Sequence, residues 1–359
     1  TDGGWGQFEY EDAETGEDVE LYSAEEVEQR HYLITRERLG AALNFDLATR
    51  SNDTYYLRML YSQFSDDEYR LRNEYKYDKG AILANEYGSN KAVFVDAEMD
   101  RDTKDRYEEQ EIFSFVIGGE NQLKDWLLEY NLGYSKSSEK EPNRIDADFA
   151  GEGLTLGYAS TNNAPRLSQT ADAHDLSRFA LDEIAFENNL TEDEELSVRV
   201  DVTKDFVWQN YNAQFKFGAK YSQREKFNEV NVMLYDGGFD DVTAAQFATD
   251  APDYELGGFG PGINRQSLRD FVLNNRSQFE HNQLESQVAN AGDSYTSDED
   301  ISAAYAMVTL DIDKWHIVTG LRYEHTSFST AGNKVELIVD EVSDDEQVNI
   351  TPWLADKSY

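Results

Sequence analysis

The residue types that most often carry chemistry are sparse in this sequence and form no reactive group. The five histidines stand apart, and no two of them have the His-x-x-x-His spacing that binds zinc on a helix. Asp293, Asp298, Glu299 and Asp300 make an oxygen-rich stretch, but their spacing is not that of an EF-hand loop, so we expect a solvated acidic loop. Cysteine is absent, which excludes thiolate metal sites and disulfides. We therefore expect no catalytic residue, no metal ligand and no cofactor.

A second group of candidates consists of charged side chains that alternate with apolar ones, and it indicates a surface. Its members are Arg199, Lys216, Lys220, Arg322 and Glu324. In an extended strand, neighbouring side chains point to opposite faces, so these charges share a face that the apolar residues leave free. Two uses remain open: contact with something that lies against this face, or ion pairs along it.

The segments that carry these residues alternate between apolar and polar positions, as strands do when their two faces meet different surroundings. From Leu196, for example, one face holds Val198 and Val200 while the other holds Ser197 and Arg199. Eight such segments occur, at 33–47, 54–64, 112–118, 126–135, 196–203, 211–221, 301–312 and 315–324.

The connections between these segments alternate in length. Short ones, at 48–53, 119–125, 203–210 and 313–314, join the segments in pairs, and long polar ones, at 65–111, 136–195 and 224–300, separate the pairs. A soluble β-sandwich has no reason to place every long loop at one end, whereas a membrane barrel has short turns on one side and long loops on the other. Aromatic residues such as Trp126 and Tyr134 end the apolar faces, where interfacial girdles lie. The sequence predicts an all-β, transmembrane antiparallel β-barrel with long extracellular loops. A soluble sandwich is the alternative.

Local structure is also predicted inside the long connections. Alternation continues from Tyr69 to Tyr77, which indicates a strand that runs beyond the membrane. Ser267 is placed to cap an amphipathic helix that carries Leu268, and Ser23 with Glu26 resembles the capping box of a short helix.

The composition excludes other classes of protein. The chain has 359 residues with 72 acidic and 32 basic ones, a formal net charge of −40, and this charge would repel nucleic acids. An aromatic content of 13% argues against disorder, and no apolar run approaches the roughly 18 residues of a membrane helix. Much of the negative charge falls in segments that we expect outside the strands, at 9–28, 96–111 and 340–346.

Several of these segments resemble signature stretches of TonB-dependent outer-membrane receptors. They are Tyr61 to Arg70 followed by Asn73-Glu74-Tyr75, Trp126 to Asn143, Ala303 to Met307, and Gly320 to Thr326. The resemblance covers nearly the whole chain, and it is closest to the subgroup abundant in Xanthomonas, Caulobacter and marine gammaproteobacteria. Each match is a strand-and-turn pattern and not a chemical site.

The resemblance implies energy-coupled import across the outer membrane of a Gram-negative bacterium and no enzymatic activity. Such a receptor has a barrel of about 22 strands with a plug domain in its lumen. A TonB–ExbB–ExbD complex acts on the plug from the periplasm. Residues 1–359 would then be a central barrel segment of about eight strands, without plug, TonB box or closing strands, since the stretch after Pro352 lacks alternation. The alternative is a complete small barrel.

The resemblance also suggests the ligand and the partners. It favours a carbohydrate or oligosaccharide as the scarce ligand and leaves a chelated metal, as in a siderophore, open. Outer-membrane lipid and lipopolysaccharide are further expected partners, and nucleic acid is not. The charged residues named above would line the lumen. Loop aromatics that could stack on a ligand, or alternatively pack the loops together, are Tyr158, Tyr235, Phe239, Tyr254 and Phe259. A passive sugar porin and a secreted carbohydrate-binding β-protein are the competing functions.

Overall fold

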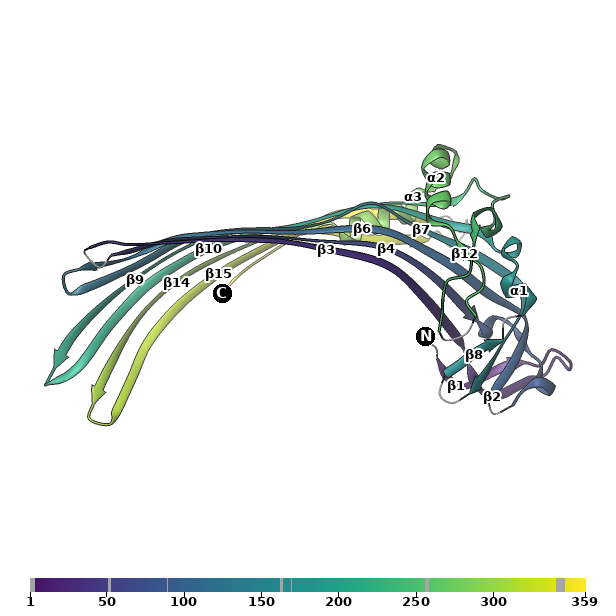
Figure 1. Cartoon of the computed structure of the whole chain (residues 1–359), viewed down its shortest axis with the longest axis horizontal. Helices are drawn as coiled ribbons and strands as arrows, with labels where there is room; N and C mark the ends of the chain where they lie inside the picture. The colour runs from purple at the N-terminus through teal and green to yellow at the C-terminus, as the bar shows by residue number, and fades with distance from the viewer. Residues whose placement is uncertain are drawn as a thin grey trace.

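One long antiparallel sheet, arched along its strands, dominates the computed structural model (Figure 1). The structure describes residues 4–50, 53–88, 90–161, 164–168, 170–255, 258–339 and 346–359, so most of the acidic segment 340–346 lies outside the described residues. The long strands lie in the order β16-β15-β14-β10-β9-β7-β6-β4-β3. Their bounds are β3 Glu26–Ala48, β4 Thr54–Lys76, β6 Lys91–Leu123, β7 Trp126–Thr161, β9 Ala180–Trp208, β10 Tyr211–Gly237, β14 Tyr295–Ile312, β15 Trp315–Val339 and β16 Glu346–Ser358.

The predicted strands form the predicted hairpins. The pairs are β3–β4, β6–β7, β9–β10 and β14–β15, and each is antiparallel. Three of the four connections are two-residue turns: the one predicted at 313–314 has that length as predicted, and those predicted at 119–125 and 203–210 shrink to it. In the β9–β10 turn both Gln209 and Asn210 have positive φ, which matches the type I′ turn that suits the twist of a hairpin.

The strands are much longer than predicted. β4 continues to Lys76, which confirms the strand predicted beyond Tyr69, and β6 begins at Lys91. Most of the connection predicted at 65–111 is therefore sheet, and the acidic stretch 96–111 lies inside β6. Charged residues continue the alternation there because they pair with charges on neighbouring strands, an effect that composition alone does not reveal.

Shorter elements gather in the half of the sheet away from the short turns (Figure 1). They are the strands β1 Trp5–Glu11, β2 Asp18–Ala24, β5 Ala81–Ile82, β8 Ala164–Ser168, β11 Ala248–Thr249, β12 Gly262–Ile263 and β13 Glu280–Asn282, the helices α1 Ala171–His174, α2 Arg265–Asn275 and α3 Gln283–Asp293, and the 3₁₀ turns Tyr77–Lys79, Ala84–Glu86, Leu176–Arg178, Ala244–Phe247 and Arg276–Gln278. Within the described residues, no helix is both long enough and apolar enough to cross a bilayer.

Three local predictions need correction. The helix predicted after Ser267 exists, but its cap is Asn264, whose side chain accepts from the Ser267 amide at 2.9 Å. Ser23 and Glu26 do not cap a helix, because they lie where β2 ends and β3 begins. The stretch around Pro352 is not irregular but lies inside β16. A proline is tolerated there because β16 is an edge strand.

Strand register keeps all the apolar series on one side of the sheet. Leu128, Val202, Phe217, Ala306 and Leu321 are direct neighbours across five successive strands. Because side chains alternate, a slip of one residue at any pairing would send the rest of a strand's apolar series to the other face. The sheet therefore has one continuous apolar face and one polar face near the short turns.

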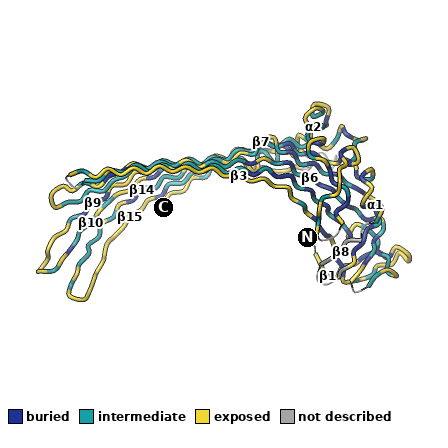
Figure 2. The backbone as a smooth tube through the Cα atoms, in the orientation of Figure 1, coloured by how far each residue is buried: buried dark blue, intermediate teal, exposed yellow. Residues whose placement is uncertain are grey.

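The buried core lies elsewhere, at the outer end of the same face (Figure 2). There residues 238–255 and 258–282 fold back over the strands, and Phe247, Phe259 and Val272 pack on a cluster that includes Leu71 and Phe149. Towards the short turns the apolar face has no such cover. Leu321 is 86% exposed, although it is a leucine in the middle of a strand.

Helix α3 occupies the position of a strand beside the outer part of β10. Ser286 and Asn290 are four residues apart on one side of the helix, and Ser294 follows at the same spacing as its C-cap residue. They accept from the backbone amides of Leu234, Val232 and Val230, at 2.9, 2.5 and 3.1 Å. Two strand residues span about 6.6 Å and one helical repeat of four spans about 6 Å, which is why the spacings match. The helix satisfies a sheet edge that would otherwise be open.

Two residues of β15 test the assignment of the two faces. Leu321→Arg places a charge on the apolar face and should cost about 2–4 kcal/mol if that face meets lipid, so the folded yield in lipid vesicles should fall sharply. Val318 is also exposed, at 53%, but its side chain points to the polar face, and Val318→Arg should fold with near-native yield. Resistance of the folded band to SDS at room temperature measures the yield. Equal yields for both variants would contradict the assignment.

Candidate functional site

The charged residues predicted to share a face do lie together on the polar face, and most of them are paired. The Arg199 Nε donates to Asp201 at 2.6 Å, and the Lys216 Nζ reaches Glu129 at 2.7 Å. Arg322 pairs with Glu324 two residues along the same strand. Lys220 lies next to Arg199 in register. Of the two uses left open by the sequence, ion pairs along the wall are the ones visible in the structure. Contact with a plug or a ligand remains a proposal.

A glycine allows this wall to connect three strands. Asp201, Gly218 and Tyr305 are direct neighbours on β9, β10 and β14. Because Gly218 has no side chain, the Tyr305 ring lies across it, and the Tyr305 hydroxyl donates to Asp201 at 2.7 Å. A Cβ at position 218 would be 2.1 Å from the Asp201 carboxylate and 2.8 Å from the Val200 carbonyl oxygen. An aromatic ring that covers a strand glycine in this way compensates for the missing side chain.

We predict that Gly218→Ala destabilises the protein by about 1–3 kcal/mol, the usual cost of overpacking, because the methyl group breaks the bond between Tyr305 and Asp201. The thermal midpoint of the detergent-solubilised protein measures the effect. Gly292→Ala is the matched control, since no atom lies within 4 Å of the added Cβ there. A Gly218→Ala midpoint no lower than that of the control would refute the role of Gly218.

Farther from the short turns the polar face becomes a dense ionic wall. Arg72 on β4, Arg106 on β6 and Arg144 on β7 each contact carboxylates of neighbouring strands. Arg72 pairs with Glu28, Glu74 and Asp102; Arg106 pairs with Glu68, Glu108 and Glu141; and Arg144 pairs with Glu141, Asp146 and Glu187. These cross-strand ion pairs keep the sheet ordered beyond its apolar belt.

One row of this wall holds carboxylates side by side. Asp102, Asp148 and Glu183 are successive neighbours on β6, β7 and β9. Burial raises the pKa of Asp102 to about 7 with a further rise from the charge of Asp148, while Arg72 opposes the shift. Burial also raises the pKa of Asp148 to about 6, and Glu183 adds to that shift. One Asp102 oxygen, Oδ1, is buried without a hydrogen-bond partner. The row therefore favours holding protons near neutral pH.

These shifts predict a pH-dependent stability. A carboxyl whose pKa is higher in the folded state binds protons on folding, so stability falls as pH rises from about 4 to about 7 and stays low above that range. Asp148→Asn removes one of the repelling charges. It should raise the thermal midpoint by about 2 °C at pH 8, the effect of roughly 1 kcal/mol in a larger domain, and have little effect at pH 4.

The control for this prediction is Asp146→Asn on the same strand. The Asp146 carboxylate accepts from Arg144, so its removal should lower the midpoint at pH 8 instead of raising it. Thermal scans between pH 4 and pH 8 distinguish the cases. If the thermal midpoint of Asp148→Asn changes with pH as that of the native protein does, the repulsion does not come from the row of Asp102, Asp148 and Glu183.

The five aromatics predicted as ligand candidates in loops are mostly buried, and two of them, Tyr158 in β7 and Tyr235 in β10, lie in strands and not in loops. Tyr158, Tyr235, Phe239 and Phe259 are between 2% and 6% exposed, and Tyr254 packs against the same cluster. Their rings contact one another or other core rings, as Tyr254 does with Phe259 at 5.4 Å between centroids. This placement corresponds to the alternative prediction, in which the aromatic residues pack the loops together. The four buried rings have no free face that a ligand in solvent could reach.

The sequence did not indicate the polar clamps that hold the outer loops. Arg101 is 2% exposed, and its guanidinium donates to the carbonyl oxygens of Pro261 and Ala173, both at 2.8 Å. Arg265 and Arg269 of α2 converge on Asp105 of β6, at 2.8 and 2.6 Å. The sequence contained one weak signal for these contacts. Arg101 and Asp105 are charged residues at positions of β6 where the alternation predicts apolar core residues.

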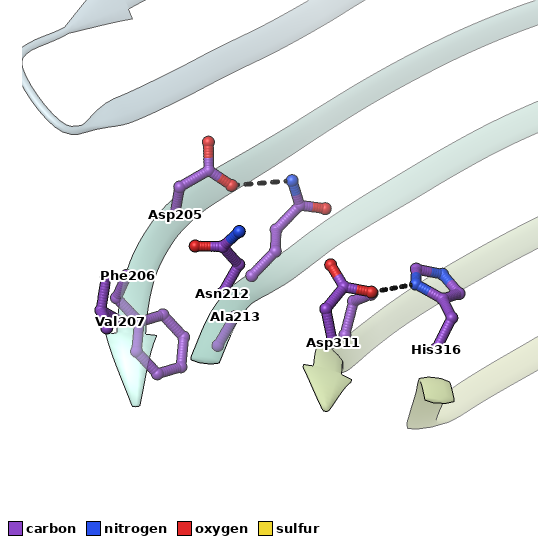
Figure 3. Close-up of a pocket in the computed structure, with 9 residues that line it drawn as sticks. Asp205, Phe206, Val207, Asn212, Ala213, Asp311 and His316 are labelled. Atoms are coloured by element: carbon purple, nitrogen blue, oxygen red, sulfur yellow. Dashed lines mark hydrogen bonds and ion pairs between the residues drawn. The ribbon is translucent and has the colours of Figure 1, made fainter. Parts of the chain in front are cut away.

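At the end near the short turns, the polar face is hollowed by an open cavity of about 690 Å³ (Figure 3). The Asp311 carboxylate accepts from His316 Nδ1 at 2.6 Å, and the Gln214 amide donates to Asp205 at 2.9 Å. Each of these two hydrogen bonds joins side chains on neighbouring strands. The four side chains do not converge on one point as a catalytic group would. Over the part of the chain that the structure describes, no three His, Asp or Glu side chains are arranged to hold a metal ion.

Comparison with known proteins gives one informative result. A family model described as "TonB dependent receptor-like, beta-barrel" matches residues 129–352. No curated protein sequence matches this chain. Among solved structures, "The crystal structure of BamA from Haemophilus ducreyi lacking POTRA domains 1-3" aligns over 99% of this chain and 75% of that chain, with 6% identity. The TM-score is 0.12, which is too low to support any argument.

Proposed function

We propose that this chain, which belongs to the TonB-dependent receptor-like β-barrel family, forms part of the wall of a receptor that imports an oligosaccharide across the outer membrane. Membership of the family supports TonB-dependent transport at the outer membrane in general terms. The sugar ligand is the finer proposal. A chelated metal, as in a siderophore, is the alternative ligand.

The observation that carries the proposal is the separation of the two faces by strand register. An apolar face without cover next to short turns suits contact with lipid, and the opposite face, with its ion pairs, suits a water-filled lumen. β3 and β16 are the free edges of the main sheet within the described residues. Free edges are not tolerated in a bilayer, so we propose that further strands complete a closed barrel around a plug domain.

The remaining partners follow from this proposal. The TonB–ExbB–ExbD complex would act on the plug from the side of the short turns. Lipid would contact the apolar face, and lipopolysaccharide would contact the outer region, with divalent cations between its phosphates and the acidic loops. Arg199, Lys216, Lys220, Arg322 and Glu324 would then line the lumen, where charges cost far less than on the lipid face.

Uptake in matched strains tests the function. Cells that express the full-length protein should accumulate a fluorescent oligosaccharide when TonB is present and lose this uptake when the tonB gene is deleted. The same protein in planar bilayers should show no steady conductance, because a plugged lumen is closed.

Two outcomes would replace the proposal. Uptake that is independent of TonB, together with steady conductance, would support the passive sugar porin. A protein that is monodisperse in water without detergent would support the secreted carbohydrate-binding alternative, because the exposed apolar face would aggregate in water if it were meant for lipid.

A further inference from the structure

The β1–β2 hairpin lies at the end of the molecule opposite the short turns (Figure 1), and two of its aromatic residues are exposed to solvent. Trp5 is 38% exposed and Tyr22 is 54% exposed. Their ring centroids lie 6.5 Å apart with an interplanar angle of 33°. Exposed rings that face the same side of a sheet make a platform for the apolar faces of sugar rings.

The platform is held rigidly from below. The Trp5 ring makes a T-shaped contact with the buried Tyr158 ring, at 4.9 Å between centroids, and the Tyr158 hydroxyl shares a hydrogen bond of 2.9 Å with Ser23. The Tyr87 hydroxyl donates to the Tyr22 carbonyl oxygen at 3.0 Å. On the opposite face of the hairpin, Tyr10 is buried in the core. These contacts position the Trp5 ring and the backbone at Tyr22 before any ligand arrives, which lowers the entropy cost of binding.

The rest of this face is polar and strongly acidic. Gln7 lies opposite Tyr22, and the next two same-face pairs along the hairpin are Glu9 with Glu20 and Glu11 with Asp18. Like charges directly opposite each other destabilise a strand pair. The sequence has no lysine or arginine before Arg30, so the hairpin itself supplies no counter-charge. A cation placed between the paired carboxylates would relieve the repulsion.

We propose that the outer face of the β1–β2 hairpin binds an oligosaccharide of amino sugars in its ammonium form. The sugar rings stack on Trp5 and Tyr22, the Gln7 amide bonds hydroxyl groups, and the ammonium groups lie between Glu9 and Glu20. Anionic sugars are excluded by the same carboxylates. This inference rests on the proposed function, in that it identifies a place where an imported glycan is first captured.

Calorimetric titration of the full-length protein in detergent tests the inference with three probes of similar length. The glucosamine hexamer should bind, its fully N-acetylated form should bind about tenfold more weakly, and the galacturonic acid hexamer should not bind. Affinity for the glucosamine hexamer should fall between about 0.05 and about 0.5 M NaCl, because screening weakens exposed charge pairs.

Variants separate the two contributions. Glu9→Gln combined with Glu20→Gln should weaken the glucosamine hexamer about tenfold and leave the N-acetylated hexamer unchanged. Tyr22→Ala should weaken both hexamers, whereas Tyr22→Phe keeps the ring and should bind normally. Glu17→Gln is the matched control, because Glu17 lies in the turn of the same hairpin and off the face. Thermal midpoints verify that each variant is folded.

Equal affinity for the charged and acetylated hexamers, no binding of either, or binding that survives Tyr22→Ala would overturn the inference. These results are distinguishable from failure of the proposed function. TonB-dependent uptake of another oligosaccharide without binding at the hairpin would leave the function intact and remove only the site. Binding at the hairpin without TonB-dependent uptake would support the binding site and contradict the proposed function.

Discussion

Backbone pairing in a fixed register is the constraint on which the rest of this structure depends. Each strand alternates with a period of two, so the sheet has distinct faces only if every neighbour is in phase. The row from Leu128 to Leu321 shows that phase is kept across five strands. Two-residue turns such as Gln209–Asn210 set the register at one end of the hairpins. In the middle of the strands, Gly218 makes room for the Tyr305 ring, which connects three neighbouring strands in register.

The same register produces two different environments along one strand. Near the turns, the apolar face has no protein cover and the polar face carries ion pairs such as Lys216–Glu129. Farther out, the apolar face becomes a protein core under residues 238–255 and 258–282, and the polar face becomes a dense ionic wall around Arg72, Arg106 and Arg144. The net charge of −40 is therefore not spread evenly, and much of it lies within strands where cross-strand pairs partly balance it.

The outer region also explains why a long sheet does not fray. Its strands extend well past any membrane, where a free edge would invite pairing with other chains. Helix α3 covers the outer edge of β10 with Ser286, Asn290 and Ser294. Arg101 and Arg265 fasten the covering loops through buried or half-buried hydrogen bonds. The loops are part of the fold, whereas the β1–β2 hairpin keeps the neighbouring rings of Trp5 and Tyr22 exposed.

The sequence by itself determined the strand pattern near the turns and the hairpin pairing, because period-two alternation and turn residues are local signals. The family was indicated by the resemblance of several strand-and-turn stretches to known receptors, and the family model that matches residues 129–352 shows it. It also identified the charged face that carries Arg199 and Arg322. Only the tertiary structure decided how far the strands extend, since Asp102 and Arg144 read as loop residues until their cross-strand partners are known. It alone decided that Tyr158 and Phe259 are buried, while Trp5 and Tyr22 remain exposed, because burial depends on which distant segments fold over a residue. Pro352 was misread for the same reason: whether a strand is an edge is a property of the sheet and not of the segment.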